Sequence, residues 1–480
     1  MEITSQDFKA VSSAKLKDEK LQKALFQAKD GFVVSRAKVV KELDNFEAIR
    51  QAASDVRDHC LAHLDEYLEA WESRAQAAGT IVHWAESYEE LNAIVVKIAQ
   101  DNRVKKIIKS KSMVGEETGL NEYVEGHGIE VKETDLGEYI IQQAGEHPSH
   151  IIAPATHKSK EDVSELFAKK HDRPRLEDAE KLTHEAREIL RPHFLDADMG
   201  ITGANFMIAE TGSTVIVTNE GNGRMTTTMP RVHVAISSIE KCIPTLDDFA
   251  LMMRLLPRSA TGQVISNYVS MTTGPKRNED LDGPGEFHVI ILDVGRTRVL
   301  GSELREALRC IRCGACMNHC PVYQNVGGHA YGWVYSGPIG AIVTPPMTNM
   351  KVASDLPYAS TLCGTCRDVC PVKIDIPKLL LHLRHKVAEG SSSERGSAWM
   401  ERLFIGQWHK TVRNRKSLER RVKLARIFLK PISRNGKIKK LRAPMVSGWT
   451  NSRDFPALAP KSFGDIWKSG LSGNNGNRNQ

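Results

Sequence analysis

The sequence of 480 residues predicts an α/β fold with a parallel sheet, preceded by N-terminal helices and followed by a cysteine-rich helical module and a basic helical region. Two observations support this prediction. Strand-like and helix-like segments alternate between about residues 78 and 295, a pattern typical of a parallel sheet with helices on both faces. Seven of the nine cysteines then fall in two short groups between residues 310 and 370.

Shifts in composition divide the chain into five regions. They are an N-terminal helical region (1–77), the α/β domain (78–295), the cysteine-rich module (296–388), a basic C-terminal region (389–470) and a tail expected to be disordered (471–480). The hydrophobic content of 41% is typical of globular domains. No apolar run approaches the roughly 18 residues of a membrane span. The first residues resemble no signal peptide, so we expect none.

The N-terminal region is predicted to be helical throughout. From Phe46 to Leu68 apolar residues recur at steps of three and four, and we expect this helix to pack on the domain that follows. Val33–Val40 is shorter and amphipathic, and it is predicted to form an exposed arm.

The α/β domain is predicted from a succession of short segments. Strands are expected at 80–85, 106–110, 128–134, 150–154, 232–236 and 286–293, with helices starting at 87, over 121–125 and between 158 and 197. Phe206–Thr218 is predicted to be a β-hairpin that turns at Glu210–Ser213.

Polar stretches of this domain are candidates for ligand binding. They are Lys109–Met113 with Glu116 and Glu117, Asp135–Glu138, and Glu210–Ser213 with the glycine-rich loop Asn219–Arg224. Lys109–Met113 follows a predicted strand, where open α/β sheets bind ligands. Glu210, Glu220 and Arg224 could bind an acid or a phosphate. No stretch matches a nucleotide-binding motif, so turns that only support the fold remain the alternative.

The cysteine spacing carries the clearest chemical signal. Cys310, Cys313, Cys316 and Cys320, followed by proline, have the C-x2-C-x2-C-x3-C-P spacing of bacterial ferredoxins. Cys363, Cys366 and Cys370, again followed by proline, repeat this spacing, and Ser360 stands at the first position of the repeat. The spacing therefore predicts iron–sulfur clusters, which carry electrons rather than transform a substrate.

In two-cluster ferredoxins the last cysteine of each motif ligates the other cluster. Crossed in this way, one [4Fe–4S] cluster takes four ligands and the other takes three. The first set is Cys310, Cys313, Cys316 and Cys370, and the second is Cys320, Cys363 and Cys366. Because the second set lacks one thiolate, Ser360, a water or a partner group completes it, or the cluster is [3Fe–4S].

Zinc and disulfides are the alternatives for these cysteines. A zinc ribbon needs two C-x2-C pairs without the Cys-Pro endings. Nothing in the sequence suggests export, so disulfides are disfavoured and a reducing, cytoplasmic location is expected. Cys60 and Cys242 stand apart and are expected to be buried apolar residues.

Residues 401–442 are strongly basic, with apolar residues interleaved, and predict a basic amphipathic helix. Such a helix could lie on anionic lipid or dock on an acidic partner protein. Nucleic acid is disfavoured because no base-reading module accompanies the helix. A solvated basic face is the alternative without a partner.

A resemblance to a known family is carried by the stretches 109–114, 133–140, 200–206, 218–224, 310–313, 326–332, 335–341, 356–360 and 370–374. With these stretches the chain resembles, over about residues 1–470, the L-lactate utilization iron–sulfur subunits, the lactate utilization protein B family. The resemblance implies a NagB/RpiA/CoA-transferase-like fold for the α/β domain. It also implies that the seven cysteines hold two [4Fe–4S] clusters and that the serine at 360 is a family trait.

The resemblance further implies a role in oxidising L-lactate to pyruvate, which supports growth on lactate. Two other subunits would take part, one with cysteine-rich repeats and one with a lone copy of the α/β domain. The chain would relay electrons within this oxidoreductase complex and is not expected to be catalytic alone. The alternatives are that the α/β domain itself binds or oxidises a small hydroxy acid, or that it is a docking scaffold.

Overall fold

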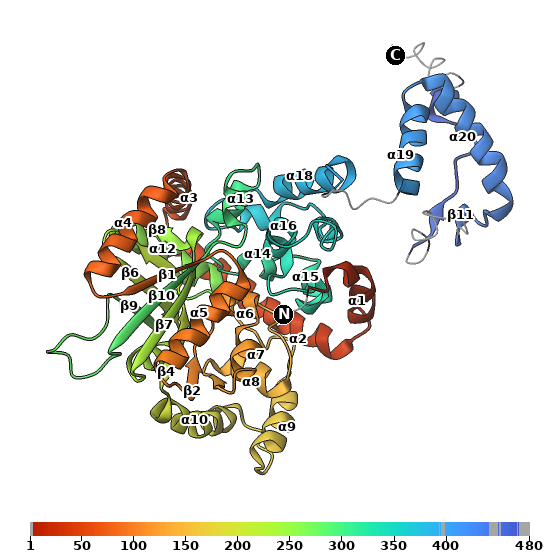
Figure 1. Ribbon diagram of the computed structural model, residues 1–480. Coiled ribbons are helices and arrows are strands. Elements are labelled where there is room, and N and C mark those ends of the chain that lie inside the picture. Colours follow the sequence, from red (N-terminus) through yellow and green to blue (C-terminus); the bar gives the residue numbers. More distant parts are fainter. Residues whose placement is uncertain are drawn as a thin grey trace. The chain divides into compact units, whose positions relative to one another are not determined.

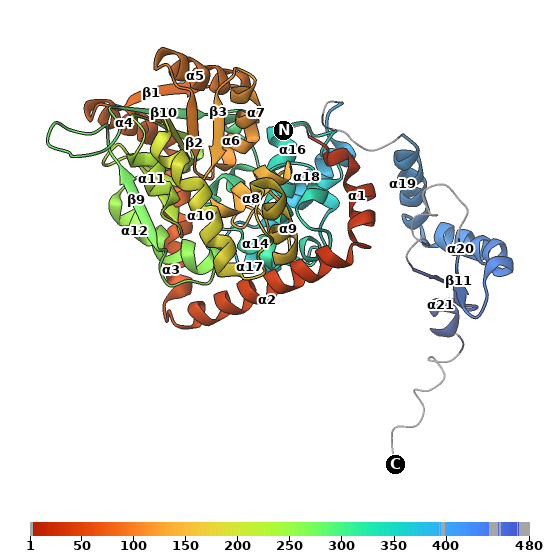
Figure 2. The same cartoon turned by 90° about the horizontal axis from the view of Figure 1, so that it is seen from below.

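The computed structural model describes residues 3–392, 394, 399–440, 450, 453–467 and 469 of the chain. The chain forms two compact units, Met1–Gly396 and Ser397–Gln480, and each is described by itself. In the first unit helices surround a sheet, and the short helices of the cysteine-rich module gather beside it (Figures 1 and 2). The predicted fold class is confirmed.

The central sheet has six parallel strands in the order β1-β10-β7-β4-β2-β3. Their bounds are β1 (Ile81–Ala85), β2 (Lys106–Lys109), β3 (Glu130–Glu133), β4 (Met199–Gly203), β7 (Val232–Ser238) and β10 (Glu286–Leu292). Successive side chains of a strand point to opposite faces. Val289 and Ile291 accordingly pack in one core and Ile290 and Leu292 in another, which explains why β10 reads as a continuous apolar run.

Helices cover both faces of this sheet. On one face lie α5 (Tyr88–Asp101), α6 (Met113–Thr118) and α7 (Leu120–Glu125), whose core contains Ile107 of β2. On the other face lie α8 (Leu136–Ala144), α9 (Lys160–His171) and α10 (Ala179–Asp196), whose core contains Ile108.

A second sheet has four strands in the order β8-β5-β6-β9. They are β5 (Phe206–Ile208), β6 (Ser213–Thr218), β8 (Cys242–Ile243) and β9 (Tyr268–Thr272), and they are accompanied by α11 (Asn222–Thr228), η2 (Ile239–Lys241) and α12 (Leu246–Ala260). β5 and β6 pair in antiparallel fashion, so the predicted hairpin is confirmed.

The strand predicted at 150–154 is wrong. This segment forms bends and turns because the His150 ring replaces strand pairing with local hydrogen bonds. Its Nδ1 accepts the backbone N–H groups of Ile152 (3.0 Å) and Ala153 (3.1 Å). Its Nε2 lies 2.9 Å from Oδ1 of Asn318 in the cysteine-rich module.

Four helices follow η1 (Ser5–Asp7) at the N-terminus: α1 (Phe8–Lys15), α2 (Glu19–Lys41), α3 (Phe46–Ala62) and α4 (Leu64–Ala77). The predicted exposed arm, Val33–Val40, is instead part of α2, where Arg36 and Val39 are buried. The reason is a distant contact, since Arg36 Nη2 donates to the backbone oxygen of Val369 (2.9 Å).

The cysteine-rich module is built from short helices. They are α13 (Arg296–Leu300), η3 (Arg305–Arg309), α14 (Ala315–Asn318), α15 (Tyr323–Val326), η4 (His329–Tyr331), α16 (Gly337–Met347), η5 (Leu356–Tyr358), α17 (Thr365–Asp368) and α18 (Ile376–Glu389). One hydrophobic core contains buried residues from this module, from the N-terminal helices and from β10, such as Ile342, Leu61 and Val289.

The second unit contains α19 (Trp399–Val412), α20 (Arg415–Leu429), η6 (Lys430–Ile432), β11 (Lys437–Ile438), β12 (Phe455–Pro456) and α21 (Phe463–Ile466). The basic region therefore forms two helices where one was predicted, because Asn414 caps a new start by accepting the Lys416 N–H (2.9 Å). The tail predicted to be disordered lies outside the described residues. Among the helices that the structure describes, none has the length and apolarity to cross a membrane.

Candidate metal centres

The two cysteine motifs share one backbone conformation. Arg312 and Gly314 have φ of 57° and 73° in the first motif, and Leu362 and Gly364 have φ of 54° and 88° in the second. This left-handed conformation is costly for residues with a Cβ atom, such as Arg312 and Leu362. The sequence repeat is therefore also a structural repeat, and each motif forms one tight loop.

The structure brings Cys310, Cys313, Cys316 and Cys370 together as a first thiol group. Burial raises the pKa of Cys313 and Cys316, and the charges of neighbouring thiols, Cys370 among them, raise it further. Burial also raises the pKa of Cys370, to about 11. Backbone N–H groups already point at the sulfurs, since that of Arg312 lies 3.3 Å from Cys310 Sγ.

Cys320, Cys363 and Cys366 form a second thiol group. Burial raises the pKa of Cys366 to about 12, with a further contribution from Cys320 and Cys363. Cys363 is exposed, and a hydrogen bond with the Thr365 hydroxyl lowers its pKa. The charge of Cys366 also acts on Cys316, so the two thiol groups adjoin.

Both groups suit clusters of iron and sulfide. Ionised thiols that crowd together in apolar surroundings are unstable unless a cation is bound. This is why the pKa values of Cys313, Cys316, Cys366 and Cys370 are raised. In the part of the chain that the structure describes, no three His, Cys, Asp or Glu side chains are arranged to hold a single metal ion. Cys60 and Cys242 belong to neither thiol group, and both are buried. They lie next to each other, since Cys60 Sγ donates to the Cys242 carbonyl (3.1 Å).

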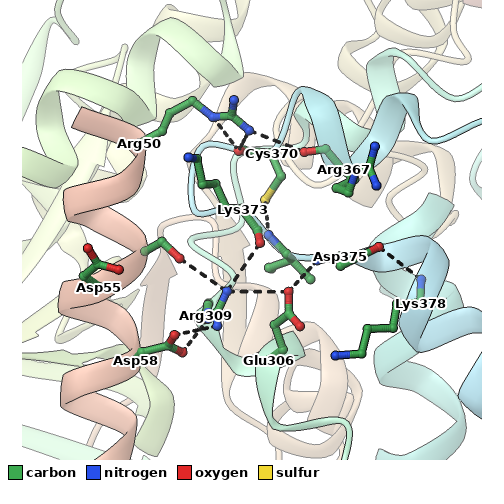
Figure 3. A network of polar contacts seen from close by, with 12 residues as sticks. Arg50, Asp55, Asp58, Glu306, Arg309, Arg367, Cys370, Lys373, Asp375 and Lys378 are labelled. Atoms are coloured by element: carbon green, nitrogen blue, oxygen red, sulfur yellow. Dashed lines mark hydrogen bonds and ion pairs between the residues drawn. The ribbon is translucent and has the colours of Figure 1, made fainter. Parts of the chain in front are cut away.

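Arginines of the N-terminal helices contact the loop that ends at Cys370, and Figure 3 shows one of them, Arg50. Arg50 of α3 donates from Nε (3.0 Å) and Nη2 (2.7 Å) to the Cys370 carbonyl. Arg36 of α2 binds the neighbouring carbonyl of Val369. The N-terminal helices therefore position a residue of the first thiol group, a role that the sequence did not reveal.

Arg309 ties the same helix to the start of the first motif. Its Nε and Nη2 each lie 2.5 Å from the Asp58 carboxylate of α3, and its Nη1 lies 3.3 Å from the Lys373 carbonyl. Arg309 precedes Cys310, and Lys373 follows Cys370. The Asp58–Arg309 ion pair, together with the hydrogen bond to Lys373, therefore joins the segments that carry Cys310 and Cys370 to α3 (Figure 3).

Asp58→Asn is expected to speed iron loss from the first thiol group by roughly tenfold, because a charge-assisted, bidentate bond worth about 1–3 kcal/mol is weakened. The measurement is iron transfer to a chelator under anaerobic conditions. Asp55→Asn is the matched control, since Asp55 lies on the same helix and bonds only Gln51 among the described residues. Equal rates in both variants would contradict the prediction.

A buried ion network joins the α/β domain to the module. Arg296 Nη2 donates to both oxygens of Glu117 (2.7 and 2.9 Å), and its Nε pairs with Glu240 (3.0 Å). Arg312 Nη2 lies 3.3 Å from Glu240, and its guanidinium lies 4.2 Å from the centre of the Tyr335 ring. Two arginines thus balance two glutamates, and the loop of the first motif is fixed against the sheet.

A cavity of about 560 Å³ lies at the carboxyl ends of β2 and β4 and reaches Arg312 of the first motif. Its wall is partly apolar, and Lys111, Lys241 and Arg312 give it positive charge. Lys241 is 9% exposed, and its Nζ makes no hydrogen bond or ion pair with the residues that the structure describes. Burial and, to a smaller extent, the charge of Arg312 lower the pKa of Lys241 to about 8.

Parts of three polar stretches singled out in the sequence meet at this cavity, which is lined by Ser110–Met113, Asp135–Gly137 and Asn219–Glu220, whereas Glu210–Ser213 does not line it. Desolvation by the surrounding protein and the charge of Asp135 raise the pKa of Glu220 to about 7, although the Glu220 side chain is exposed to solvent.

Several candidate residues do not line the cavity, among them Lys109, Glu116, Glu117, Glu138, Glu210 and Arg224. Lys109 is buried with Glu116 (2.8 Å) and Glu133 (2.5 Å). Glu210 instead accepts the Leu246 N–H, and Arg224 lies over the Tyr268 ring.

No sequence pattern predicted that Lys241, Arg312 or Tyr335 lines this cavity. Lys241 comes three residues after a buried strand, and Tyr335 lies in the insert between the motifs. The one usable signal was Arg312, a charged residue inside a C-x2-C motif.

Two described families match the chain, a LUD domain over residues 68–292 and a 4Fe-4S dicluster domain over residues 306–374. The fold and the thiol groups thus define an iron–sulfur protein in which a LUD domain is joined to a 4Fe-4S dicluster domain.

Relatives named lactate utilization protein B align over nearly the whole chain. The relative from Macrococcus caseolyticus is 41% identical over 473 residues (98% of both chains). Those from Shouchella clausii (42% over 456 residues, 95% of both chains) and Bacillus subtilis (41% over 466 residues, 97% of this chain and 96% of the relative) are similar. The chain belongs to the lactate utilization protein B family.

Among solved structures, a duf162 family protein from Deinococcus radiodurans aligns with 48% of this chain and 98% of its own. The TM-score is 0.27 at 14% identity, so the alignment carries no argument.

Proposed function

We propose that the chain is the electron-transfer subunit of a multi-protein system that oxidises L-lactate to pyruvate and supports growth on lactate. The names of its relatives support a role in lactate utilization. The two thiol groups support electron transfer, and the observation that carries the proposal is their ferredoxin-type cysteine spacing within the segment that matches a 4Fe-4S dicluster domain. Clusters bound at these groups supply one-electron chemistry.

The seven cysteines of the two motifs are proposed to hold one cluster in each thiol group. Cys310, Cys313, Cys316 and Cys370 would hold one [4Fe–4S] cluster, and Cys320, Cys363 and Cys366 the other. Cys313 and Cys370 are buried, whereas Cys363 is exposed. Because Cys363 is the one exposed thiol of the two groups, the second group is proposed as the point of exchange with a partner.

The partners are proposed to be two other lactate-utilization subunits, one with cysteine-rich repeats and one with a lone LUD-type domain. The second unit offers a contact surface, because the basic helix α20 exposes Leu424 (53%), Ile427 (67%) and Phe428 (75%). A membrane surface or an acidic partner protein would suit this face.

Cys313→Ala and Cys363→Ala are expected each to remove about half of the iron and acid-labile sulfide, because each residue belongs to a different thiol group. Anaerobic EPR of the reduced, reconstituted protein should show the loss of a different signal in each variant. Cys242→Ala, which alters a thiol outside both groups, is the control. Colourless protein, or protein with zinc and no sulfide, would overturn the proposed function.

The cavity favours a second candidate function, in which the α/β domain binds or oxidises a small hydroxy acid. Lys241, which has no polar partner among the described residues, and nearby Arg312 suit a carboxylate, and Arg312 lies between Cys310 and Cys313 in the sequence. The isolated protein, assayed anaerobically for lactate-dependent dye reduction, separates the candidates. Reduction that Lys241→Met abolishes would favour the second candidate, and no reduction without partners would favour the first.

A further inference from the structure

The side chain of Ser360 makes the same backbone contact as that of Cys310. The Arg312 N–H donates to Cys310 Sγ (3.3 Å), and the Leu362 N–H donates to Ser360 Oγ (3.1 Å). In both motifs the donor is two residues after the acceptor and has a left-handed backbone. Ser360 thus occupies in three dimensions the place that a thiol ligand takes in the first motif.

The position of Ser360 is fixed from outside the motif. Arg384 of α18 donates from Nη2 to the Ser360 carbonyl (3.2 Å) and from Nε to the Pro357 carbonyl (2.8 Å). Its guanidinium also lies 5.1 Å from the centre of the Tyr358 ring. Arg384 therefore contacts the segment before the second motif at three residues, and such outer contacts orient a ligand-bearing loop.

Among the described residues, the Ser360 hydroxyl has no hydrogen-bond acceptor. Its oxygen accepts the Leu362 N–H, but its O–H donates to no residue that the structure describes. Ser302 shows the ordinary case, because its Oγ also accepts the N–H two residues on, from Leu304 (3.1 Å), while its O–H donates to the Val299 carbonyl (2.9 Å). The free O–H sets Ser360 apart from a serine that only supports a turn.

We infer that Ser360 Oγ is the fourth protein ligand of the second cluster, beside Cys320, Cys363 and Cys366. This inference rests on the proposed function, since it requires a cluster at the second thiol group. An Fe–O bond forms, and the hydroxyl proton is released to solvent, which reaches the half-buried Ser360. Oxygen is a harder donor than sulfur, so this cluster has one unique iron and differs electronically from the all-thiolate first cluster.

Ser360→Ala tests the inference in the full chain after anaerobic reconstitution. The expected result is conversion of the second cluster to [3Fe–4S], seen as an EPR signal in the oxidised protein and as the loss of about one iron per chain, with the first cluster unchanged. Ser302→Ala is the matched control and should leave both clusters as they are.

Ser360→Cys is a second test, which keeps the inference falsifiable if Ser360→Ala does not fold. It should keep four irons at the second site while shifting the EPR signal of that cluster alone, because sulfur replaces oxygen. An unchanged signal in Ser360→Cys, or an intact four-iron cluster in Ser360→Ala, would overturn the inference. A second cluster that is [3Fe–4S] in the unaltered protein would overturn it too, whereas the absence of any second cluster would overturn the proposed function itself.

Discussion

Glu240→Gln is expected to lower the free energy of unfolding of the first unit by about 3–5 kcal/mol, because it leaves a buried arginine without its counter-charge. Glu240 is 1% exposed and pairs with Arg296 (3.0 Å) and Arg312 (3.3 Å). Burial alone would raise the pKa of Glu240, but the two guanidinium groups lower it to about 2. The carboxylate is therefore charged at every pH at which the protein would be studied.

The loss is measured by denaturant unfolding under anaerobic conditions, with iron content determined for each sample. Glu66→Gln is the control, since the Glu66 side chain is 76% exposed and its pair with His63 is worth little. If Glu240→Gln changed stability no more than this control, the ion network would have no structural role.

Acidification is expected to cost the first unit about 3 kcal/mol through His150 alone, between the ordinary histidine pKa near 6.5 and a folded-state pKa near 4. Burial lowers the pKa of His150 to about 4, although the bond with Asn318 opposes this shift. The neutral ring is locked in place, because Nδ1 accepts two backbone N–H groups. Below pH 6.5 the unfolded chain takes up the proton and the folded chain does not, so stability falls as the pH falls.

The test compares unfolding free energies at several pH values for the unaltered protein and for His150→Gln. The variant should be less stable at pH 7 but should lose less stability on going to pH 4. His184→Gln, which alters a side chain that is 65% exposed, should keep the full pH dependence. Parallel curves for the unaltered protein and His150→Gln would refute the role given to this histidine.

Local patterns in the sequence predicted what depends on neighbouring residues. The spacing of the thiols and the turn of the hairpin at Glu210–Ser213 are short-range features, and the structure contains both the hairpin and the two thiol groups. The prediction of an exposed arm at Val33–Val40 was wrong because Arg36 is buried against Val369, whose carbonyl accepts its hydrogen bond and which lies 333 residues away in the sequence. Similarly, the pair of Glu117 with Arg296 joins positions 179 residues apart, which no periodicity reveals.

In the candidate site, too, short-range features were predictable from the sequence and long-range contacts were not. Lys111 was singled out by its place after a strand, and the structure puts it at the cavity. Lys109, from the same stretch, was drawn into a buried cluster by Glu133, a residue of a different strand. A rule about strand ends could not separate these two lysines, because the difference lies in which carboxylates the fold brings near.

The shared core of the first unit has a consequence for how the protein is made. Cys313 and Cys320 are themselves members of that core, together with residues of the N-terminal helices and the sheet. Completion of the interior and binding of iron are therefore expected to be coupled during folding. The supply of iron and sulfide in the cell is then expected to set how much of the protein survives quality control.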